Sequence, residues 1–211
     1  MYYRPGNRMT PVVKGLIIAN VIVWILQIYF AKIGFNLEEY GALWTFQTGN
    51  FKVWQLVTHM FMHDTGNPEM GNIDIMHILF NMIALFIFGH HLEDRWGSKR
   101  FLEFYMICGL GAAAAELIIG QAYAVVGASG AIMGLMAAFA YLFPNTEMFI
   151  GFIPFPIKMK YIAIGTILID LFGGLDSSNN DHIAHWAHLG GALVGLVLVI
   201  YSNRTNRKTF Y

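Results

Sequence analysis

Ser129 is the residue of this sequence with the clearest potential for chemistry. It stands in the segment Gly127-Ala128-Ser129-Gly130, directly before an apolar run. A serine hydroxyl becomes a nucleophile when a base takes its proton, and near neutral pH that base is commonly a histidine. The glycines allow a tight turn, and the start of a helix offers free N–H groups to a developing oxyanion. Glycine and serine are also common where membrane helices pack, so the segment alone leaves both interpretations open.

His188, in the segment AHLGGALVG (187–195), could serve as this base. It shares one predicted helix face with two glycines, at the spacing i, i+3 and i+7. The run that begins at Ser129 carries a glycine pair of its own, and two glycine-bearing faces let membrane helices approach closely. The sequence therefore predicts that these helices bring His188 toward Ser129. The glycines concerned are Gly130 and Gly134 in the first run and Gly191 and Gly195 in the second.

His77 and Asn81 form a third polar element. They are four residues apart in HILFN (77–81), so a helix places both on one face. Their side chains can donate hydrogen bonds, which an oxyanion pocket requires. On spacing alone, a polar clasp between helices explains the pair equally well, just as a packing role explains a single histidine.

The composition indicates a membrane protein. Of 211 residues, 56% are hydrophobic and 12% are charged, and the mean hydropathy is +0.52. Soluble domains carry about twice that charged fraction. The formal net charge is zero, so no nucleic-acid partner is expected. The single cysteine, Cys108, lies inside an apolar run, where a packing role is the simplest interpretation.

Six apolar segments qualify as membrane helices, and we expect one membrane-embedded domain over residues 1–211. Crossing the hydrocarbon core takes roughly 20 residues. The second and fourth segments have only about 15, which span about 23 Å, so we expect them inside a bundle beside a water-filled cavity. The segments are about 12–31, 75–90, 101–120, 128–143, 159–175 and 186–202.

The basic residues predict the orientation. Eleven Lys and Arg residues lie on the side of the two termini and two lie on the other, so both termini are expected in the cytoplasm. The second, fourth and sixth segments then begin at the outer face, and the four polar side chains considered above share one depth. Polar groups there are costly unless paired or wetted, which indicates a site. The eleven are Arg4, Arg8, Lys14, Arg95, Lys99, Arg100, Lys158, Lys160, Arg204, Arg207 and Lys208, and the two are Lys32 and Lys52.

Together these elements resemble the rhomboid intramembrane serine proteases. The matching motifs are His-x-x-x-Asn at 77–81, Glu-x-Arg at 93–95, Gly-x-Ser-Gly at 127–130 and Ala-His-x-x-Gly-x-x-x-Gly at 187–195. The resemblance covers about residues 54–201 and implies an all-α, six-transmembrane-helix rhomboid-like bundle with a long first outer loop. It implies no cofactor and no metal, and transmembrane protein substrates and the lipid bilayer as partners. It also implies the inner membrane of a bacterium with the site facing the exterior, and it leaves the oligomeric state open.

The resemblance implies a role for each matched residue. Ser129 is the expected nucleophile and His188 the general base, as a dyad without a third carboxylate. The backbone N–H of Ser129 and the side chains of His77 and Asn81 are the expected oxyanion donors. The expected activity is cleavage of membrane-anchored proteins in or near their transmembrane segments. The side chains of the Glu-x-Arg motif, which are Glu93 and Arg95, are expected to hold a cytoplasmic connection rather than to react.

The long connection over residues 32–74 is expected to lie partly in the membrane interface, because it is rich in aromatic residues. Family members often have arginine where this chain has Gln55, so the anchor that this arginine forms is altered. His59 and His63 have a spacing that zinc sites use, but the resemblance suggests that they hold the loop instead. The segment HDTGNPEMGNID (63–74) is extra length that either shapes substrate access or is a tolerated insertion.

Two alternatives to a protease stand beside this interpretation. A transporter or channel would use His77, Asp170 and His188 as a proton path, although no inverted repeat is obvious. A non-catalytic rhomboid-like binding protein would keep the fold without the reaction.

Glu116 is expected to reach the interface, and Asp170 to cap a polar contact. A mobile gate is expected to include GGLDSSNNDH (173–182).

Overall fold

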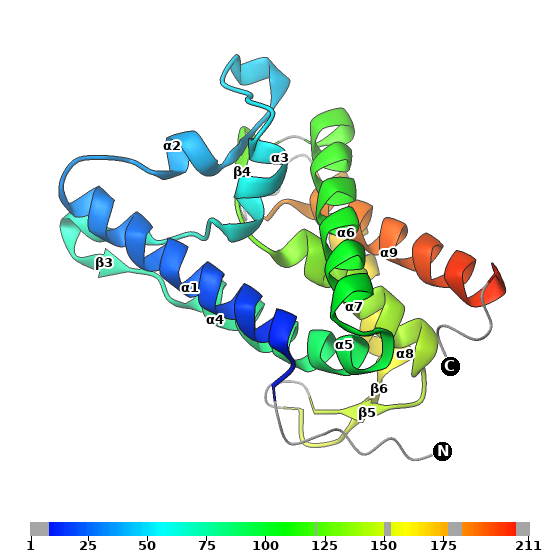
Figure 1. Ribbon diagram of the computed structural model, residues 1–211. Helices are drawn as coiled ribbons and strands as arrows, with labels where there is room; N and C mark the ends of the chain where they lie inside the picture. Colours follow the sequence, from blue (N-terminus) through cyan, green and yellow to red (C-terminus); the bar gives the residue numbers. More distant parts are fainter. Residues whose placement is uncertain (1–8, 121, 150–152, 177–182, 206–211) are drawn as a thin grey trace.

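The computed structural model describes residues 9–120, 122–149, 153–176 and 183–205, and it is built mainly of α-helices (Figure 1). The longer helical elements are α1 (Pro11–Lys32), α4 (Met76–Ala84), η4 (Leu85–Gly89), α5 (His90–Trp96), α6 (Ser98–Ile119), α7 (Ser129–Leu142), α8 (Met159–Leu175) and α9 (His185–Thr205). Shorter ones lie between α1 and α4, namely α2 (Glu38–Gly41), η1 (Phe46–Thr48), α3 (Gln55–Thr58), η2 (His59–Phe61) and η3 (Pro68–Met70). Three small antiparallel sheets pair β1 (Leu43–Trp44) with β4 (Ala124–Val125), β2 (Gly66–Asn67) with β3 (Asn72–Ile73), and β5 (Glu147–Met148) with β6 (Ile157–Lys158).

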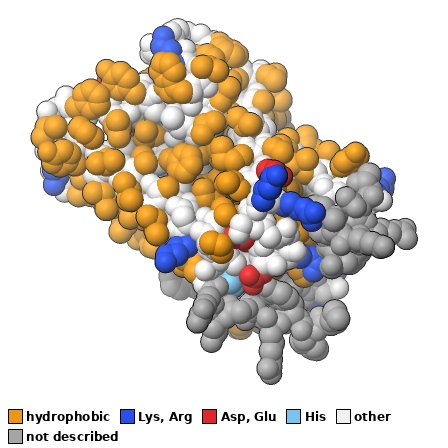
Figure 2. All heavy atoms as spheres, viewed as in Figure 1, with side chains coloured by type: hydrophobic (Ala, Val, Ile, Leu, Met, Phe, Trp, Pro, Cys, Tyr) orange, Lys and Arg blue, Asp and Glu red, His pale blue; other side chains and the backbone are white. Residues whose placement is uncertain are grey.

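Among the described residues, four helices are long and apolar enough to cross a membrane. They are Pro11–Lys32, Met76–Trp96, Ser98–Ile119 and His185–Arg204. Figure 2 shows hydrophobic side chains spread over the face that carries α1, while charged side chains gather toward the end where α5, β5 and β6 lie. Such a band of exposed apolar side chains suits contact with lipid rather than water. The chain is an integral membrane protein of helical architecture.

The second helical segment is longer than the sequence predicted. The expectation was 75–90, whereas the helix runs over Met76–Trp96 through α4, the π-helical turn η4 and α5. The charged residues near its end do not stop it, because Glu93 is only 2% exposed and accepts hydrogen bonds from the start of α1. Of the two segments predicted to be short, only the fourth is short, since α7 has 14 residues.

The connection between α1 and α4 is ordered by pairing with distant parts of the chain. Strand β1 pairs with β4, which lies just before α7, and the backbone N–H of Thr45 donates to the carbonyl of Tyr123 at 3.1 Å. The backbone N–H of Gly127 donates to the carbonyl of His59 at 2.9 Å. The first loop therefore holds the turn that leads into α7.

Helices α6, α7 and α9 pack against one another, and α7 and α9 meet backbone to backbone. A Cβ atom on Gly191 would collide with the carbonyl oxygen of Gly130, and one on Gly195 would lie 2.5 Å from the carbonyl oxygen of Gly134. Glycine makes this approach possible because it has no side chain to separate the helices. The four glycines that the sequence paired across these helices do lie together.

Gly173 and Gly174 belong to the last turn of α8, not to a loop as the sequence suggested. Their lack of side chains makes room for the first turn of α9. A Cβ atom on Gly173 would overlap the ring of His185, and one on Gly174 would lie 3.1 Å from the ring of Trp186. The two helix ends therefore touch here. The rest of the predicted gate, from residue 177 to 182, lies outside the described residues.

Candidate active site

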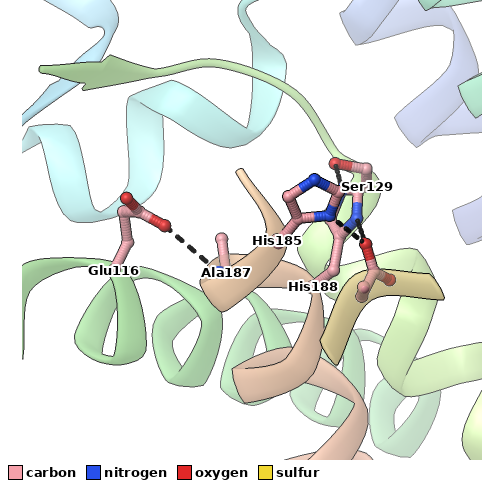
Figure 3. A network of polar contacts seen from close by, with 6 residues as sticks. Glu116, Ser129, His185, Ala187 and His188 are labelled. Carbon is pink, nitrogen blue, oxygen red and sulfur yellow. Dashed lines mark hydrogen bonds and ion pairs between the residues drawn. The ribbon is translucent and has the colours of Figure 1, made fainter. Parts of the chain in front are cut away.

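Ser129 is the first residue of α7 and lies in contact with His188 of α9. The Oγ atom of Ser129 and the Nε2 atom of His188 are 2.8 Å apart. Both side chains are partly exposed, so water and a substrate can approach them. Because the first turn of a helix has N–H groups without partners in the helix, the backbone around Ser129 is suited to holding an anion. Figure 3 shows Ser129 and His188 pointing toward each other.

The other ring nitrogen of His188 contacts a carboxylate. Its Nδ1 atom is 3.0 Å from Oδ1 of Asp170, which belongs to α8. The same oxygen is 2.9 Å from Nδ1 of His185, one turn earlier on α9. The sequence interpretation gave Asp170 a capping role and expected His188 to act without a carboxylate. In the structure a buried carboxylate, 4% exposed, lies directly behind the imidazole.

His77 faces the same site from α4, and its protonation is set by the backbone. The N–H of Asp64 donates to Nδ1 of His77 at 3.1 Å, so the neutral ring carries its proton on Nε2. That Nε2 atom and Oγ of Ser129 both lie within 4 Å of the point where a side chain on Gly127 would begin. Gly127 has φ of 125°, which a residue with a side chain rarely adopts. His77 therefore presents an N–H donor to the space beside Ser129.

The extra segment 63–74 supplies this contact. It contains the β2–β3 hairpin, and Asp64 lies just before it. The Asp64 side chain accepts from the backbone N–H of Gly66 at 2.8 Å, and the backbone N–H of Asp74 donates to the carbonyl of Thr65 at 3.1 Å. The segment thus has a fixed geometry that holds the donor for His77.

Asn81 is less directly engaged than the sequence predicted. It is 7% exposed, and its side-chain nitrogen donates to the carbonyl of His77, one turn earlier on α4, at 2.8 Å. Its Oδ1 atom is buried and has no hydrogen-bond partner among the described residues. The structure brings Asn81 to the site beside His77 but forms no hydrogen bond from Asn81 to Ser129 or His188 among these residues.

Gln55 takes the anchoring position where family members often have arginine. It is 1% exposed, and its Oε1 atom accepts from the backbone N–H of Lys52 at 3.0 Å and of Trp44 at 3.4 Å. Its backbone carbonyl accepts from Nδ1 of His59 at 2.7 Å. The amide therefore ties two parts of the first loop together without a charge.

His59 and His63 are buried ring anchors of the first loop. Nε2 of His63 donates to Oδ1 of Asn20 at 2.8 Å, because the Asn20 amide nitrogen is used by the carbonyl of Leu16. Burial lowers the pKa of His59 from 6.5 to about 4. Burial, helped by the neighbouring His77, lowers the pKa of His63 to about 3. Both rings are therefore held neutral in the folded protein.

This burial predicts a loss of stability in acid. Between pH 6.5 and the lowered pKa values, the unfolded chain binds protons at His59 and His63 that the folded chain does not. The contribution of these two histidines to the free energy of unfolding is therefore fully present above pH 6.5. It falls as the pH drops toward about 4, where His59 also becomes protonated in the folded protein. At about pH 5 each histidine should cost about 2 kcal/mol. The measurement is thermal or denaturant unfolding in detergent at about pH 7.5 and about pH 5.

The control for this prediction is His63→Gln, which keeps a donor for Asn20 but does not titrate. The variant should lose roughly half of the pH dependence that the two histidines contribute. Equal pH dependence in the wild type and His63→Gln would contradict the assignment.

Glu93 and Arg95 contact the ends of helices, at the start of α1 and after the end of α7. Oε1 of Glu93 accepts from the backbone N–H of Val12 at 2.9 Å, and Oε2 accepts from that of Val13 at 2.8 Å. A carboxylate in this place satisfies free N–H groups and favours the positive end of α1. The guanidinium of Arg95 lies 5.3 Å from the ring centre of Phe143. Both residues have structural contacts that fit the holding role expected for them.

Glu116 does not reach the interface, which corrects the sequence expectation. It is 2% exposed, and Oε2 accepts from the backbone N–H of Ala187 at 3.2 Å, in the first turn of α9 (Figure 3). Oε1 accepts from the N–H of Ala122 at 3.3 Å. Because Ala187 precedes His188, this carboxylate fixes the helix start that carries the imidazole.

Two contacts of the site were missed by sequence reasoning. Asp170 behind His188 and the Asp64 backbone behind His77 are second partners of rings that the motifs had identified. A polar residue inside an apolar helix was a usable signal for Asp170. The Asp64 contact comes from a backbone group, so no residue type could have indicated it.

The fold and the site together define a class, that of polytopic membrane proteins in which helix ends bring a serine and a histidine into contact. The Rhomboid domain family matches residues 50–204 of the chain. Rhomboid protease AarA of Providencia stuartii is 30% identical over 225 residues, covering 88% of this chain and 70% of AarA. Rhomboid protease GluP of Bacillus subtilis (strain 168) is 34% identical over 161 residues, covering 76% of this chain and 28% of GluP.

Plant proteins are among the relatives as well. RHOMBOID-like protein 6, mitochondrial, of Arabidopsis thaliana is 31% identical over 165 residues, covering 77% of this chain and 48% of the plant protein. The chain thus spans about half the length of this relative. The chain belongs to the rhomboid family, and the resemblance seen in its motifs is confirmed.

Proposed function

We propose that this protein is an intramembrane serine endopeptidase, with Ser129 as its nucleophile and His188 as its general base. The observation that carries the proposal is the 2.8 Å contact between Oγ of Ser129 and Nε2 of His188. That distance lies within the range over which a base takes a proton from a hydroxyl. Membership in a family with protease-named relatives supports the same reaction. The proposed substrates are membrane-anchored proteins, cut in or near their transmembrane segments.

The proposed mechanism begins with proton transfer from Ser129 to Nε2 of His188 as Oγ attacks the scissile carbonyl. The carbonyl oxygen becomes negative, and the backbone N–H of Ser129 and Nε2–H of His77 are the donors placed to hold it. Asn81 assists through the hydrogen bond from its amide to the carbonyl of His77, and its second amide hydrogen is a further donor for the oxyanion. His188 then gives the proton to the leaving amine, and water hydrolyses the acyl-enzyme.

The proposed topology follows the charge pattern. The six proposed membrane segments are α1, the helix Met76–Trp96, α6, α7, α8 and α9. With six segments and the observed distribution of basic residues, both termini are proposed to lie in the cytoplasm. The start of α7 and the start of α9 then lie on the outer side, where water can reach Ser129. The short α7 fits this placement, because a helix of 14 residues covers about 21 Å and ends inside the bundle. The proposed location is the inner membrane of a bacterium.

A serine-directed probe tests the proposal. The purified 211-residue chain in detergent is treated with a fluorophosphonate, and cleavage of a membrane-anchored reporter is measured in parallel. Wild type should label and cleave, whereas Ser129→Ala and His188→Ala should lose turnover by at least about 10³-fold. The matched control is Ser202→Ala, a serine on α9 outside the site, which should behave as wild type.

Two results would overturn the proposal. Labelling that persists in Ser129→Ala would mean that the probe reacts elsewhere. A wild type that neither labels nor cleaves, but carries ions or protons when reconstituted in vesicles, would favour a transporter.

A further inference from the structure

We infer that Asp170 is a positioning residue for His188, so that the site works as a serine–histidine–aspartate triad rather than as a pair. The inference rests on the proposed function, because it concerns the base of that reaction. It starts from three helices meeting at one point: Ser129 from α7, Asp170 from α8 and His188 from α9. Figure 3 shows the side chains of Ser129, His185 and His188 close together at this point.

The first step of the argument is the tautomer of His188. To take the hydroxyl proton of Ser129, Nε2 must carry a lone pair, so the ring proton must be on Nδ1. Nδ1 lies 3.0 Å from Oδ1 of Asp170, which accepts that N–H. The carboxylate therefore selects the tautomer in which His188 is a base toward Ser129. It also fixes the plane of the ring.

The second step is the charge that appears during the reaction. When the bond between Oγ and the carbonyl carbon forms, the hydroxyl proton moves to Nε2 and His188 becomes an imidazolium. Asp170 keeps its negative charge and lies next to it, 4% exposed and poorly screened by water. A fixed carboxylate at this distance stabilises the charged ring in the transition state, which raises kcat.

The third step is the support of the carboxylate itself. Nδ1 of His185 lies 2.9 Å from the same Oδ1 atom, so a second N–H holds the oxygen in place. The His185 ring in turn lies over Gly173, where any side chain would displace it. Oδ2 of Asp170 is buried and has no hydrogen-bond partner among the described residues. Among the described residues, the hydrogen bonds of this carboxylate are therefore those that Oδ1 accepts from His185 and His188.

The decisive variant is Asp170→Asn, which keeps the shape but can turn its amide N–H toward Nδ1. His188 would then carry its proton on Nε2 and could not accept the hydroxyl proton. We expect kcat to fall by about 10² to 10⁴-fold, while KM stays within about twofold because Asp170 lies behind the imidazole and away from the nucleophile. Asp170→Glu should recover at least about tenfold over Asp170→Asn.

The matched control is Thr166→Val, one turn earlier on α8, where the hydroxyl donates to the carbonyl of Ile162 within the same helix at 2.9 Å. It should keep the kcat of wild type. Thermal unfolding of each variant gives the folded fraction, to which kcat is referred. A purely structural role would lower that fraction equally in Asp170→Asn and Asp170→Glu and leave kcat per folded molecule unchanged.

A second measurement does not depend on activity. In the wild type labelled with ¹⁵N-histidine, at a pH where the ring is neutral, the two ring nitrogens of His188 report which of them carries the proton. The resonances of His188 are assigned by their loss in His188→Gln. We expect protonated Nδ1 in the wild type, and protonated Nε2 in Asp170→Asn.

The inference would be overturned by protonated Nε2 in the wild type or by unchanged kcat in folded Asp170→Asn. These outcomes differ from failure of the proposed function itself. If Ser129→Ala abolishes cleavage while Asp170→Asn does not alter it, the protein is a serine protease in which Asp170 does not position His188. If Ser129→Ala still cleaves, the assignment of Ser129 as the nucleophile fails first.

Discussion

Replacing Gly191 by alanine is expected to destabilise the folded protein by about 3 kcal/mol or more. A Cβ atom at this position would collide with the carbonyl oxygen of Gly130, which is backbone and cannot rotate away. Helices α7 and α9 would have to separate along their contact, and the close packing on both sides would be lost. The midpoint of unfolding in detergent, followed by circular dichroism or protease resistance, measures the effect.

The matched control is Gly165→Ala in α8, where nothing lies within 4 Å of the new methyl group. Alanine is the better helix former, so this variant should be neutral or more stable by up to about 1 kcal/mol. Similar stability in the two variants would contradict the close packing of α7 and α9. Because this packing brings Ser129 to His188, the Gly191 variant should also lose cleavage in the fraction that stays folded.

His77→Phe is expected to lower kcat by about 10² to 10³-fold with little change in KM. Phenylalanine keeps an aromatic ring of similar size, including the edge contact with His63, whose ring centre is 5.2 Å away. It removes the Nε2–H that faces the space beside Ser129. A donor that acts on the developing oxyanion contributes mainly in the transition state, so the loss appears in kcat. Steady-state cleavage of a membrane-anchored reporter separates kcat from KM.

His77→Gln supplies the comparison, since its amide can donate a hydrogen bond from a nearby position. It should retain more activity than His77→Phe. Asn81→Ala should reduce kcat less than His77→Phe, because in the described structure Asn81 acts on the site through the carbonyl of His77. A His77→Phe variant with wild-type kcat would remove His77 from the proposed oxyanion pocket.

The motifs indicated which side chains lie close together, because each motif is a local pattern. Glycine spacing predicted the approach of α7 and α9, and His188 lies on that face within reach of Ser129. The helical class could likewise be predicted, since apolar length is a property of each segment alone. Among the described residues, four helices are long enough to cross a membrane on their own. Helices α7 and α8 are shorter.

Contacts between distant segments could not be predicted in the same way. The carboxylate of Asp170 reaches His188 from another helix, 18 residues away, and no spacing rule links them. The second helix continues past its predicted end at residue 90, because Glu93 has partners at the start of α1, a contact between distant segments that no local pattern reveals. The sequence left two roles open for the extra segment at 63–74, substrate access or a tolerated insertion, and neither indicated that it carries the backbone donor that sets His77.

The anchoring of α1 has a consequence for where an independent folding unit begins. The Rhomboid domain match starts at residue 50, after α1. Yet Gln27 exchanges two hydrogen bonds with the backbone of His63, at 2.9 and 3.0 Å, and Asn20 holds the His63 ring. A fragment trimmed to the similarity boundary would leave these buried groups and Glu93 without partners. A fragment that folds on its own therefore has to include α1, and expression trials should keep this helix.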